Sequence, residues 1–433
     1  MATTYLSRTP STGVNRRTFT FSAWIKRARI NAYDIIFEAS NGSHTFQMAT
    51  NPTSGGDCIR IYDYNGTTNL DLKTNQAFRD LSAWYHIVLA IDTTQATNTN
   101  RAKFYVNGEQ VTSLATSTYP SLDYDTGLNN NVPMQIGRQQ SSSDYFNGSM
   151  THIHFIDGLA YDADTFGETD ATTGIWKPKT APSVTYGTNG FFLKGENSSA
   201  LGTDSSGRGN NFTVNGTPTQ TIDTPANVFA TLNPLALTTR QTLSNGNLTG
   251  TSSSWTSAIS TFGFTKGKYY AEVKYVDTTG NIMVGVMDEQ DMSSLTGGTG
   301  GLGFTTNSVG YYSSDGTKFI GDSASSYGAS YTANDILGIA VDLDSATKTV
   351  TFYKNEASQG VINLPTTGTG TFFIGTSTTS NGISAINFGN GFFGTTAVAS
   401  AQNPDDGIGI FEYDVPAGYR ALCTKSINAE EYS

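Results

Sequence analysis

The sequence predicts an all-β protein that consists of two antiparallel β-sandwich domains in tandem. Helical periodicity is almost absent, and short runs of β-branched and aromatic residues recur about every 8–12 residues, separated by Gly, Asn, Asp, Ser and Thr. The 433 residues correspond to two or three domains at about 100–200 residues per domain. Many short antiparallel strands in segments of this size favour two-sheet sandwiches, in which each sheet buries one face.

The runs themselves predict individual strands. In the first half they cover residues 19–25, 58–64, 85–91, 102–106, 134–137 and 150–156. In the second half they cover residues 269–275, 282–286, 309–312, 336–343 and 349–354. Runs meet at Asn65-Gly66, Asn107-Gly108 and Asp315-Gly316, dipeptides that tolerate the positive φ angles of a type I′ turn. Antiparallel hairpins are therefore the predicted building unit.

A change of composition marks the predicted domain boundary. Residues 214–235 include Pro218, Pro225 and Pro234 and no Lys or Arg. Because proline fixes φ and removes a backbone donor, this segment is expected to be an extended connector. We therefore expect a first domain at residues 1–214, a linker at 215–235 and a second domain at 236–433, which ends in an extension from Asn403 onwards.

Composition and charge argue against several classes of function. A net charge of −11, from 36 acidic and 25 basic side chains, opposes binding to nucleic acid or to anionic lipid. The chain has no apolar run of about 18 residues and no apolar signal-peptide core at its start, so we expect neither membrane insertion nor secretion. Cys58 and Cys423 do not make a disulfide framework, which favours assembly in a reducing cytoplasm.

Four motifs in the first half follow one another in the order of a known family. They are Trp84-Tyr85-His86-Ile87-Val88, Phe104-Tyr105-Val106-Asn107-Gly108, Ile136-Gly137-Arg138 and Phe146-Asn147-Gly148-Ser149-Met150. Over residues 5–165 the series resembles the laminin-G-like, concanavalin A-like jelly-roll domains. The resemblance implies a sandwich in which Trp84 and Tyr105 fill the space between the two sheets.

The second half resembles a different β-sandwich family, the SPRY domain. The matching segments, within residues 245–390, are Gly267-Lys268-Tyr269-Tyr270-Ala271-Glu272-Val273, Val284-Gly285-Val286, Val309-Gly310-Tyr311-Tyr312, Asp335-Ile336-Leu337-Gly338, Val341-Asp342-Leu343-Asp344 and Val350-Thr351-Phe352-Tyr353-Lys354-Asn355. Such domains usually bind proteins or ligands and have no catalytic residues. Glu356 stands where the family usually has Gly, so a differently shaped hairpin is expected there.

The order of the two domains and the segments 7–27, 166–179, 204–216 and 415–428 resemble tandem laminin-G/SPRY proteins of tailed, especially marine, bacteriophages. This resemblance implies a non-enzymatic virion structural protein, associated with tail fibres or the capsid surface, that attaches to a host-surface glycan or protein. Other virion proteins are then partners, and the location is the virion. A homo-oligomer is also expected, although no coiled coil is visible.

Two further functions stay open at this point. One is a capsid decoration or cement protein that binds only other virion proteins, and the other is a glycan-cleaving enzyme. Glycosidases pair carboxylates about 5–10 Å apart, and a glucanase family with this fold carries an E-x-D-x-x-E pattern. Glu168 and Asp170 begin that pattern, but Thr173 stands at its third acidic position in a turn-rich stretch. We therefore expect no catalytic residue.

Histidine and aspartate are the only candidate metal ligands. His152 and His154 alternate on a predicted strand and share a face that suits a metal, but a polar outer face explains them as well. No cofactor is expected, with calcium left open because Asp57, Asp63 and Asp144 could supply scattered ligands, as in some laminin-G-like domains.

Two predicted loops have the composition of a sugar-binding surface, where aromatic rings stack on pyranose rings and polar side chains bind hydroxyl groups. They are residues 139–145 and 323–331, and they make Asp144, Tyr145 and Tyr327 the candidate carbohydrate-binding residues. The glycine series at residues 297–303 resembles a phosphate-binding loop only superficially, since no Lys-Ser/Thr follows it. It is expected to be a flexible surface loop.

Overall fold

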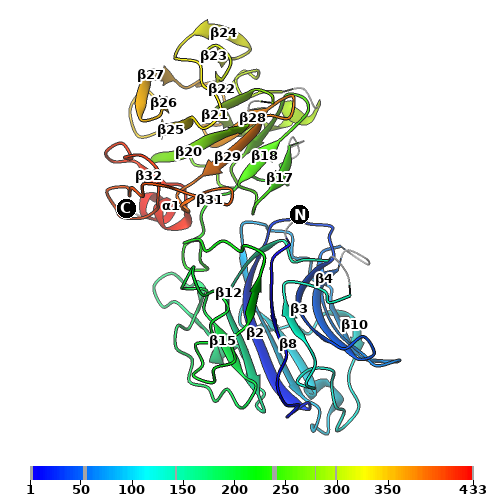
Figure 1. Ribbon diagram of the computed structural model, residues 1–433. Coiled ribbons are helices and arrows are strands. Elements are labelled where there is room, and N and C mark those ends of the chain that lie inside the picture. Colours follow the sequence, from blue (N-terminus) through cyan, green and yellow to red (C-terminus); the bar gives the residue numbers. More distant parts are fainter. Residues whose placement is uncertain are drawn as a thin grey trace. The chain divides into compact units, whose positions relative to one another are not determined.

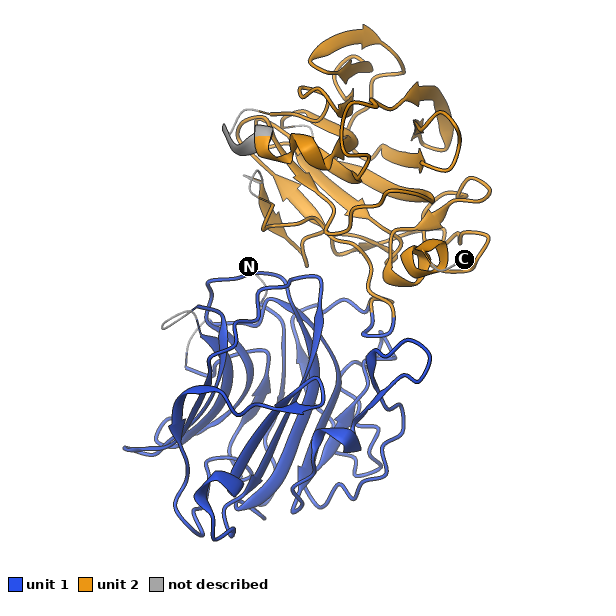
Figure 2. Ribbon diagram, turned by 180° about the vertical axis from the view of Figure 1, so that it is seen from behind, with its two compact units in different colours: residues 1–220, 224–226 blue, residues 221–223, 227–433 orange. Residues whose placement is uncertain are grey.

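The protein is described by a computed structural model that covers residues 3–51, 56–141, 144–236, 241–277, 279–297 and 300–431. The chain divides into two compact units, with 1–220 and 224–226 in unit 1 and 221–223 and 227–433 in unit 2 (Figure 2). Both units are built from antiparallel sheets, which confirms the predicted all-β class (Figure 1). No helix in the described ranges is long and apolar enough to cross a membrane.

Unit 1 is a sandwich of an eight-stranded and a six-stranded sheet. The larger sheet has the order β10 (Leu114–Thr118), β6 (Thr68–Thr74), β5 (Cys58–Tyr64), β4 (Thr45–Asn51), β3 (Asp34–Ser40), β11 (Met134–Ile136), β1 (Tyr5–Arg8) and β16 (Thr213–Asn215). The smaller sheet has the order β15 (Phe191–Leu193), β12 (Gly148–Asp157), β2 (Thr18–Arg27), β7 (Trp84–Asp92), β8 (Ala102–Val106) and β9 (Glu109–Gln110). Short 3-10 helices η1 (Asn98–Asn100) and η2 (Ala163–Thr165) and the hairpin β13 (Gly167–Thr169)–β14 (Trp176–Pro178) complete the unit.

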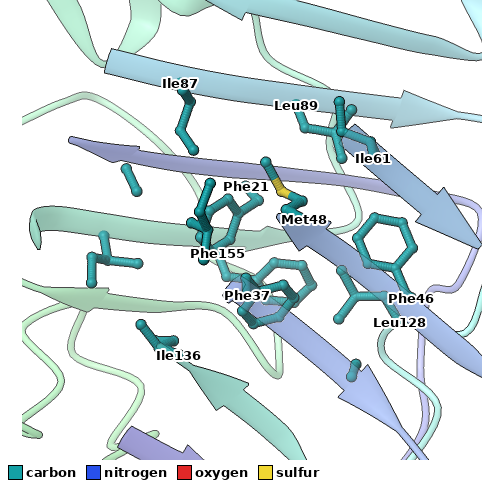
Figure 3. Close-up of a cluster of buried hydrophobic side chains, with 14 of the residues drawn as sticks. Phe21, Phe37, Phe46, Met48, Ile61, Ile87, Leu89, Leu128, Ile136 and Phe155 are labelled. Carbon is teal, nitrogen blue, oxygen red and sulfur yellow. The ribbon is translucent and has the colours of Figure 1, made fainter. Parts of the chain in front are cut away.

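The core of unit 1 lies between these sheets and follows the period of two along each strand. Phe21 and Phe155 from the smaller sheet face Phe37, Met48 and Ile61 from the larger one (Figure 3). Because successive side chains of a strand point to opposite faces, the residues between these core positions point away from the core. The sequence predicted the strands that carry Phe21, Ile61 and Phe155, whereas β3 and β4, which carry Phe37 and Met48, were not among the predicted strands.

The second face of the six-stranded sheet is also covered, which the sequence did not predict. Residues 159–187 cross this face and bury Val88, Tyr105 and Phe166 in a separate apolar cluster. The expectation that Tyr105 fills the space between the sheets is therefore wrong, because it lies in this outer cluster and its hydroxyl donates to Asp162. Trp84 is not in the inter-sheet core either, and its neighbour Tyr85 is.

Unit 2 is a second two-sheet sandwich. One sheet has the order β17 (Thr242–Ser244), β18 (Thr249–Thr251), β29 (Ile383–Asn387), β20 (Lys268–Asp277), β25 (Ile336–Asp342), β26 (Thr349–Lys354) and β27 (Ala357–Asn363), with β32 (Arg420–Ala421) parallel to β20. The other has the order β19 (Thr256–Ile259), β28 (Phe372–Thr378), β21 (Ile282–Asp288), β22 (Ser308–Tyr312), β23 (Thr317–Ile320) and β24 (Ser323–Ser326). Outside them lie η3 (Glu289–Gly297), the hairpin β30 (Phe392–Phe393)–β31 (Thr396–Ala397) and α1 (Thr424–Glu431).

Both ends of the unit 2 sequence pack onto its first sheet. Phe229 forms an isolated β-bridge with Cys423, and both side chains are buried in one cluster with Tyr270 and Phe411. Leu232 forms an isolated β-bridge with Ser260, which follows β19 of the second sheet, and its side chain is buried in the core between the sheets. The second half of the segment expected to be a linker thus contributes to the interior of unit 2, since apolar residues between its prolines are buried there.

The turns show where a dipeptide pattern determines backbone shape. Asn107 and Gly108, between β8 and β9, both have positive φ, as a type I′ turn requires. At the 65–66 and 315–316 turns only the glycine has positive φ, so the type I′ prediction is wrong at these two. Asn355 and Glu356 both have positive φ, at 45° and 73°, so this hairpin keeps the glycine-type shape despite its glutamate.

Candidate functional site

A row of polar side chains crosses the outer face of the eight-stranded sheet of unit 1. Strand register places six residues opposite one another in succession on β1, β11, β3, β4, β5 and β6, and we call them the outer-face row: Ser7, Gln135, Glu38, Gln47, Tyr62 and Asp71. Their neighbours along the strands belong to the core, so these side chains point to the opposite face. This sheet therefore presents one apolar and one polar face.

The centre of the outer-face row is an ordered hydrogen-bond chain. The Tyr33 hydroxyl donates to Gln47, and the Gln47 Nε2 donates to Glu38 Oε2 at 2.7 Å. The backbone N–H of Gln140 donates to the other Glu38 oxygen at 2.8 Å. Burial raises the pKa of Glu38 above its usual value. The carboxyl group is thus held in place by the amide groups of Gln47 and Gln140, and the nearby Arg138 guanidinium partly offsets the effect of burial on its pKa.

Three polar atoms beside this chain have no hydrogen-bond partner within the described residues. They are Oε1 of Gln135, whose side chain is only 8% exposed, Oε1 of Gln140 and Nε of Arg138. A buried polar atom without a partner costs about 1–3 kcal/mol, and such atoms usually meet water or a ligand. Gln135 lies on β11, and Arg138 and Gln140 lie in the segment that follows this strand.

Aromatic rings flank the row on β5. The Arg60 guanidinium lies 4.2 Å from the centre of the Tyr62 ring. Tyr62 stacks on Tyr64, with the ring centroids 6.1 Å apart and an angle of 10° between the ring planes. Two hydrogen bonds of 2.7 Å to Asp71 hold the guanidinium in place. Tyr64 is 40% exposed, so the stack of Arg60, Tyr62 and Tyr64 ends with a ring in contact with solvent.

The predicted residues Asp144 and Tyr145 lie at the other flank of the same face. Tyr145 forms an isolated bridge with Arg138, whose guanidinium lies 4.7 Å from the Tyr5 ring and 5.6 Å from the Tyr145 ring. The backbone oxygen of Asp144 accepts from Gln139 at 2.9 Å, and residues 142 and 143 of this loop lie outside the described part. The structure thus places both residues beside the outer-face row.

Tyr327, the third predicted residue, lies in unit 2 and is not part of this face. Its hydroxyl donates to Gly360 and accepts from the backbone N–H of Phe352, and its ring packs on Tyr311 at 5.2 Å. Burial raises the pKa of Tyr327 to about 12. The stretch predicted as a loop around it begins with strand β24, all of which is exposed.

The carboxylates of the incomplete glucanase pattern are engaged in a hairpin. Asp170 Oδ2 accepts from Lys177 Nζ at 2.8 Å, and Glu168 lies 3.6 Å from the same ammonium group. The backbone N–H groups of Thr172 and Thr173 donate to the other oxygen of Asp170. Both carboxylates thus close the β13–β14 hairpin.

The histidine pair does not form the exposed polar face that the sequence suggested. A bulge in β12 separates His152 from His154, and His152 has a φ of 48°. His154 is buried, stacks on Phe192 at 3.9 Å and meets the Tyr186 hydroxyl at 2.9 Å. Burial lowers the pKa of both histidines, which therefore favours their neutral forms.

Two of the aspartates considered for calcium already have protein partners. Asp57 accepts from Arg27 at 2.9 Å and from the Asn31 backbone at 2.7 Å. Asp63 accepts from the Tyr124 hydroxyl and the Gly127 backbone, both at 2.7 Å. Among the described residues, no group of three or more His, Cys, Asp or Glu side chains could hold a metal ion.

Unit 2 has a shallow cleft of about 380 Å³, lined among others by Tyr275, Ser313, Tyr331 and Lys354. The two tyrosine hydroxyls donate to backbone oxygens, and the Lys354 ammonium binds Ser330 and Asp335. Because the two hydroxyl groups and the ammonium group already bind other groups of unit 2, they are less available to a ligand than the unpartnered atoms beside the outer-face row.

The fold defines a tandem β-sandwich protein, and comparisons specify its two domains. Residues 2–164 match the concanavalin A-like lectin/glucanases superfamily, and residues 268–391 match the SPRY domain. The chain therefore carries a concanavalin A-like domain followed by a SPRY domain, as the motifs predicted. No curated protein matches the chain as a whole or in part.

Several solved structures are similar to part of the chain at low identity. A human SPRY domain is 18% identical, with 34% of this chain and 94% of the other covered and a TM-score of 0.28. A heptameric SAP-like pentraxin from Limulus polyphemus is 15% identical over 36% of this chain and 71% of its own, with a TM-score of 0.27. Domain 4 of an arabinanase from Geobacillus stearothermophilus is 14% identical, with 34% of this chain and 64% of the other covered and a TM-score of 0.27.

The residues that the sequence missed lie on strands and not on loops. Arg60, Tyr62 and Tyr64 alternate with Ile59 and Ile61 on β5, and this alternation is the signal that could have placed them on one face. Glu38, Gln47 and Gln135 could not be joined to them, because this needs the order of strands in the sheet.

Proposed function

We propose that the chain is a non-enzymatic virion protein of a tailed bacteriophage that attaches to a host-surface glycan through the outer-face row of unit 1. The observation that carries this proposal is the set of buried, unpartnered polar atoms of Gln135, Gln140 and Arg138 beside fixed tyrosine rings. Because the three atoms are buried, a saccharide would reach them only after these side chains rotate toward the solvent, and its hydroxyl groups, which both donate and accept, would then satisfy the two amide oxygens and the guanidinium N–H. Aromatic rings beside them offer apolar surface for a pyranose ring.

The charges of the face favour a neutral saccharide. Arg60 is neutralised by Asp71 through two hydrogen bonds, and the charge of the Arg138 guanidinium lies close to the Glu38 carboxyl group. The chain as a whole has a net charge of −11, which also opposes anionic polymers. The engagement of Glu168 and Asp170 by Lys177 supports binding without cleavage.

The virion location rests on the resemblance of the tandem arrangement and its flanking segments to phage proteins. A particle released by lysis presents its surface proteins to the exterior without secretion, which fits a chain that has two cysteines, both free and buried. Partners are then the neighbouring virion proteins, and a homo-oligomer would multiply weak glycan contacts.

The binding test uses the full chain on an array of neutral glucose-, galactose-, mannose- and N-acetylglucosamine-based oligosaccharides. Gln135→Leu should reduce binding at least about tenfold, because it removes the unpartnered side-chain amide from the proposed site. The stability of the fold should not change, because leucine has a similar volume and leaves no unpaired polar group. Leu122→Ala, at a residue of unit 1 that is 53% exposed, is the matched control and should bind as wild type. No binding by the wild-type chain, or equal binding by Gln135→Leu, would refute the proposed site.

Two further measurements test the rest of the proposal. Reducing-sugar release from the bound oligosaccharides should be absent, and its loss in Glu168→Gln would instead identify an enzyme. Mass spectrometry of gradient-purified particles should find the chain on their exterior. Presence on particles with no glycan binding would favour the decoration or cement protein.

A further inference from the structure

Four aromatic side chains gather on the outer face of the six-stranded sheet of unit 2, and we call them the unit 2 aromatic cluster. They are Trp255, Phe304, Phe319 and Tyr312. Tyr312 follows the core residue Tyr311 on β22, and Phe319 on β23 is paired with Gly310, which lies between the core residues Val309 and Tyr311. Alternation therefore places both rings on the face opposite the core.

The cluster has a closed geometry. The distances between ring centroids are 6.1 Å for Trp255 and Phe304 and 5.1 Å for Phe304 and Phe319. They are 6.1 Å for Phe319 and Tyr312 and 5.6 Å for Tyr312 and Trp255. All four contacts are edge to face. Each ring is thus oriented by two others, which fixes the exposed ring surfaces before any ligand arrives.

A pinned loop brings Phe304 into the cluster. The backbone N–H of Leu302 donates to Ser377 Oγ at 2.8 Å, and the backbone N–H of Gly303 donates to Ser308 Oγ at 2.8 Å. A Cβ at Gly310 would lie 2.1 Å from the Leu302 oxygen, so only glycine lets this loop lie on the sheet. The expectation of a flexible loop is therefore wrong for residues 300–303, while residues 298 and 299 lie outside the described part.

The four rings are half-buried and belong to none of the apolar core clusters of the described chain. The Trp255 indole N–H and the Tyr312 hydroxyl make no hydrogen bond within the described residues. Ser254 precedes Trp255 and is exposed, and exposed Asp322 donates its backbone N–H to Gly303 at 2.8 Å, beside Phe304. An apolar platform with donors on two of its rings and hydroxyl and carboxylate acceptors close by suits the apolar face and the hydroxyl groups of a neutral sugar ring.

We infer that the unit 2 aromatic cluster is a second saccharide-binding site, which stacks the apolar face of a neutral pyranose and binds its hydroxyl groups through Trp255 and Tyr312. This inference rests on the proposed function of unit 1 and extends it to a chain with two sites. A chain that engages one polysaccharide at two sites gains avidity without tighter individual contacts.

The test uses the full chain, the same array of neutral oligosaccharides and three variants of unit 2. Trp255→Ala should weaken binding to densely immobilised oligosaccharide at least about tenfold through lost avidity. Trp255→Phe should lie between this variant and wild type, because it keeps a ring and removes the N–H. Val361→Ala, at a residue that is 65% exposed on β27, should bind as wild type.

A footprint on the wild-type chain makes the result independent of how the variants fold. Hydroxyl-radical oxidation of Trp255 and Tyr312 should fall when the best-bound oligosaccharide of the array is added. If oligosaccharide binds, Gln135→Leu abolishes binding, and neither Trp255→Ala nor the footprint responds, unit 1 alone is the binding site and the inference is overturned. If no oligosaccharide binds to the wild-type chain, the proposed function fails together with it.

Discussion

The stability of unit 2 should depend on pH through one buried carboxyl group. Glu272 on β20 is fully buried, and its two oxygens accept the backbone N–H groups of Glu412 at 2.8 Å and Tyr413 at 2.9 Å. The Tyr270 hydroxyl donates to the same carboxyl at 3.3 Å. Glu272 therefore holds the C-terminal extension against the sheet.

The direction and size of the effect follow from its pKa. Burial raises the pKa of Glu272 from 4.5 to about 7, despite the two N–H donors. Below pH 4.5 the group is protonated in the folded and unfolded chain, and its contribution to stability is fully present. Between these values only the unfolded chain ionises, so the free energy of unfolding falls as pH rises through the folded pKa, by about 3 kcal/mol in all.

The two cysteines provide an assay for each unit. Cys423 is buried in unit 2 and Cys58 in unit 1, so each thiol reacts with dithiodipyridine only when its own unit opens. Urea titrations between pH 4 and 8, followed by peptide mapping of the modified thiol, then give separate free energies of unfolding. Unit 1 serves as the internal reference for effects of pH on the reagent.

Comparing the pH dependence of unit 2 stability in wild type and in Glu272→Gln separates the effect of Glu272 from the effects of other carboxyl groups. The variant cannot titrate, so the difference in unit 2 stability between wild type and variant should change by about 3 kcal/mol between pH 4.5 and 7. The variant also loses one acceptor, which shifts its stability equally at every pH. A difference that stays constant over this range would refute the reasoning.

Three further predictions concern the backbone, a buried ion pair and the connection between the units. Glu356→Gly should stabilise unit 2 by about 1 kcal/mol, since glutamate in the left-handed region is strained, and urea titration with Cys423 labelling measures it. Asp57→Ala should destabilise unit 1 by about 3–5 kcal/mol, because it leaves the buried Arg27 charge unpaired. Asp123→Ala, in an exposed pair, should cost under about 1 kcal/mol, and equal losses would contradict the argument. Limited proteolysis should cut within residues 216–226 and leave two folded fragments, whereas fragments that unfold would show that the units depend on one another.

The sequence was sufficient for the parts of the structure that depend on local physics. Runs of apolar and β-branched residues identified strands such as β5 and β8 to the residue, although the side of the sheet expected for Tyr105 on β8 was wrong. Asn107-Gly108 predicted its turn because both residues tolerate positive φ at little cost. Motif order predicted the two domain families, since core residues and tight turns recur at fixed positions in each.

The tertiary structure alone decided which strands are neighbours and which faces are covered. Glu38 and Gln135 meet because β3 pairs with β11, a choice that depends on long-range packing and leaves no local trace. His154 is buried because a distant segment covers its sheet, and Phe304 joins Trp255 because a glycine-lined sheet admits the loop between them. The candidate sites therefore join residues of predicted strands, such as Tyr62 and Tyr312, to residues such as Glu38 and Phe319, whose strands were not predicted. Their association required the order of strands, because contacts between non-adjacent strands depend on the packing of the whole unit.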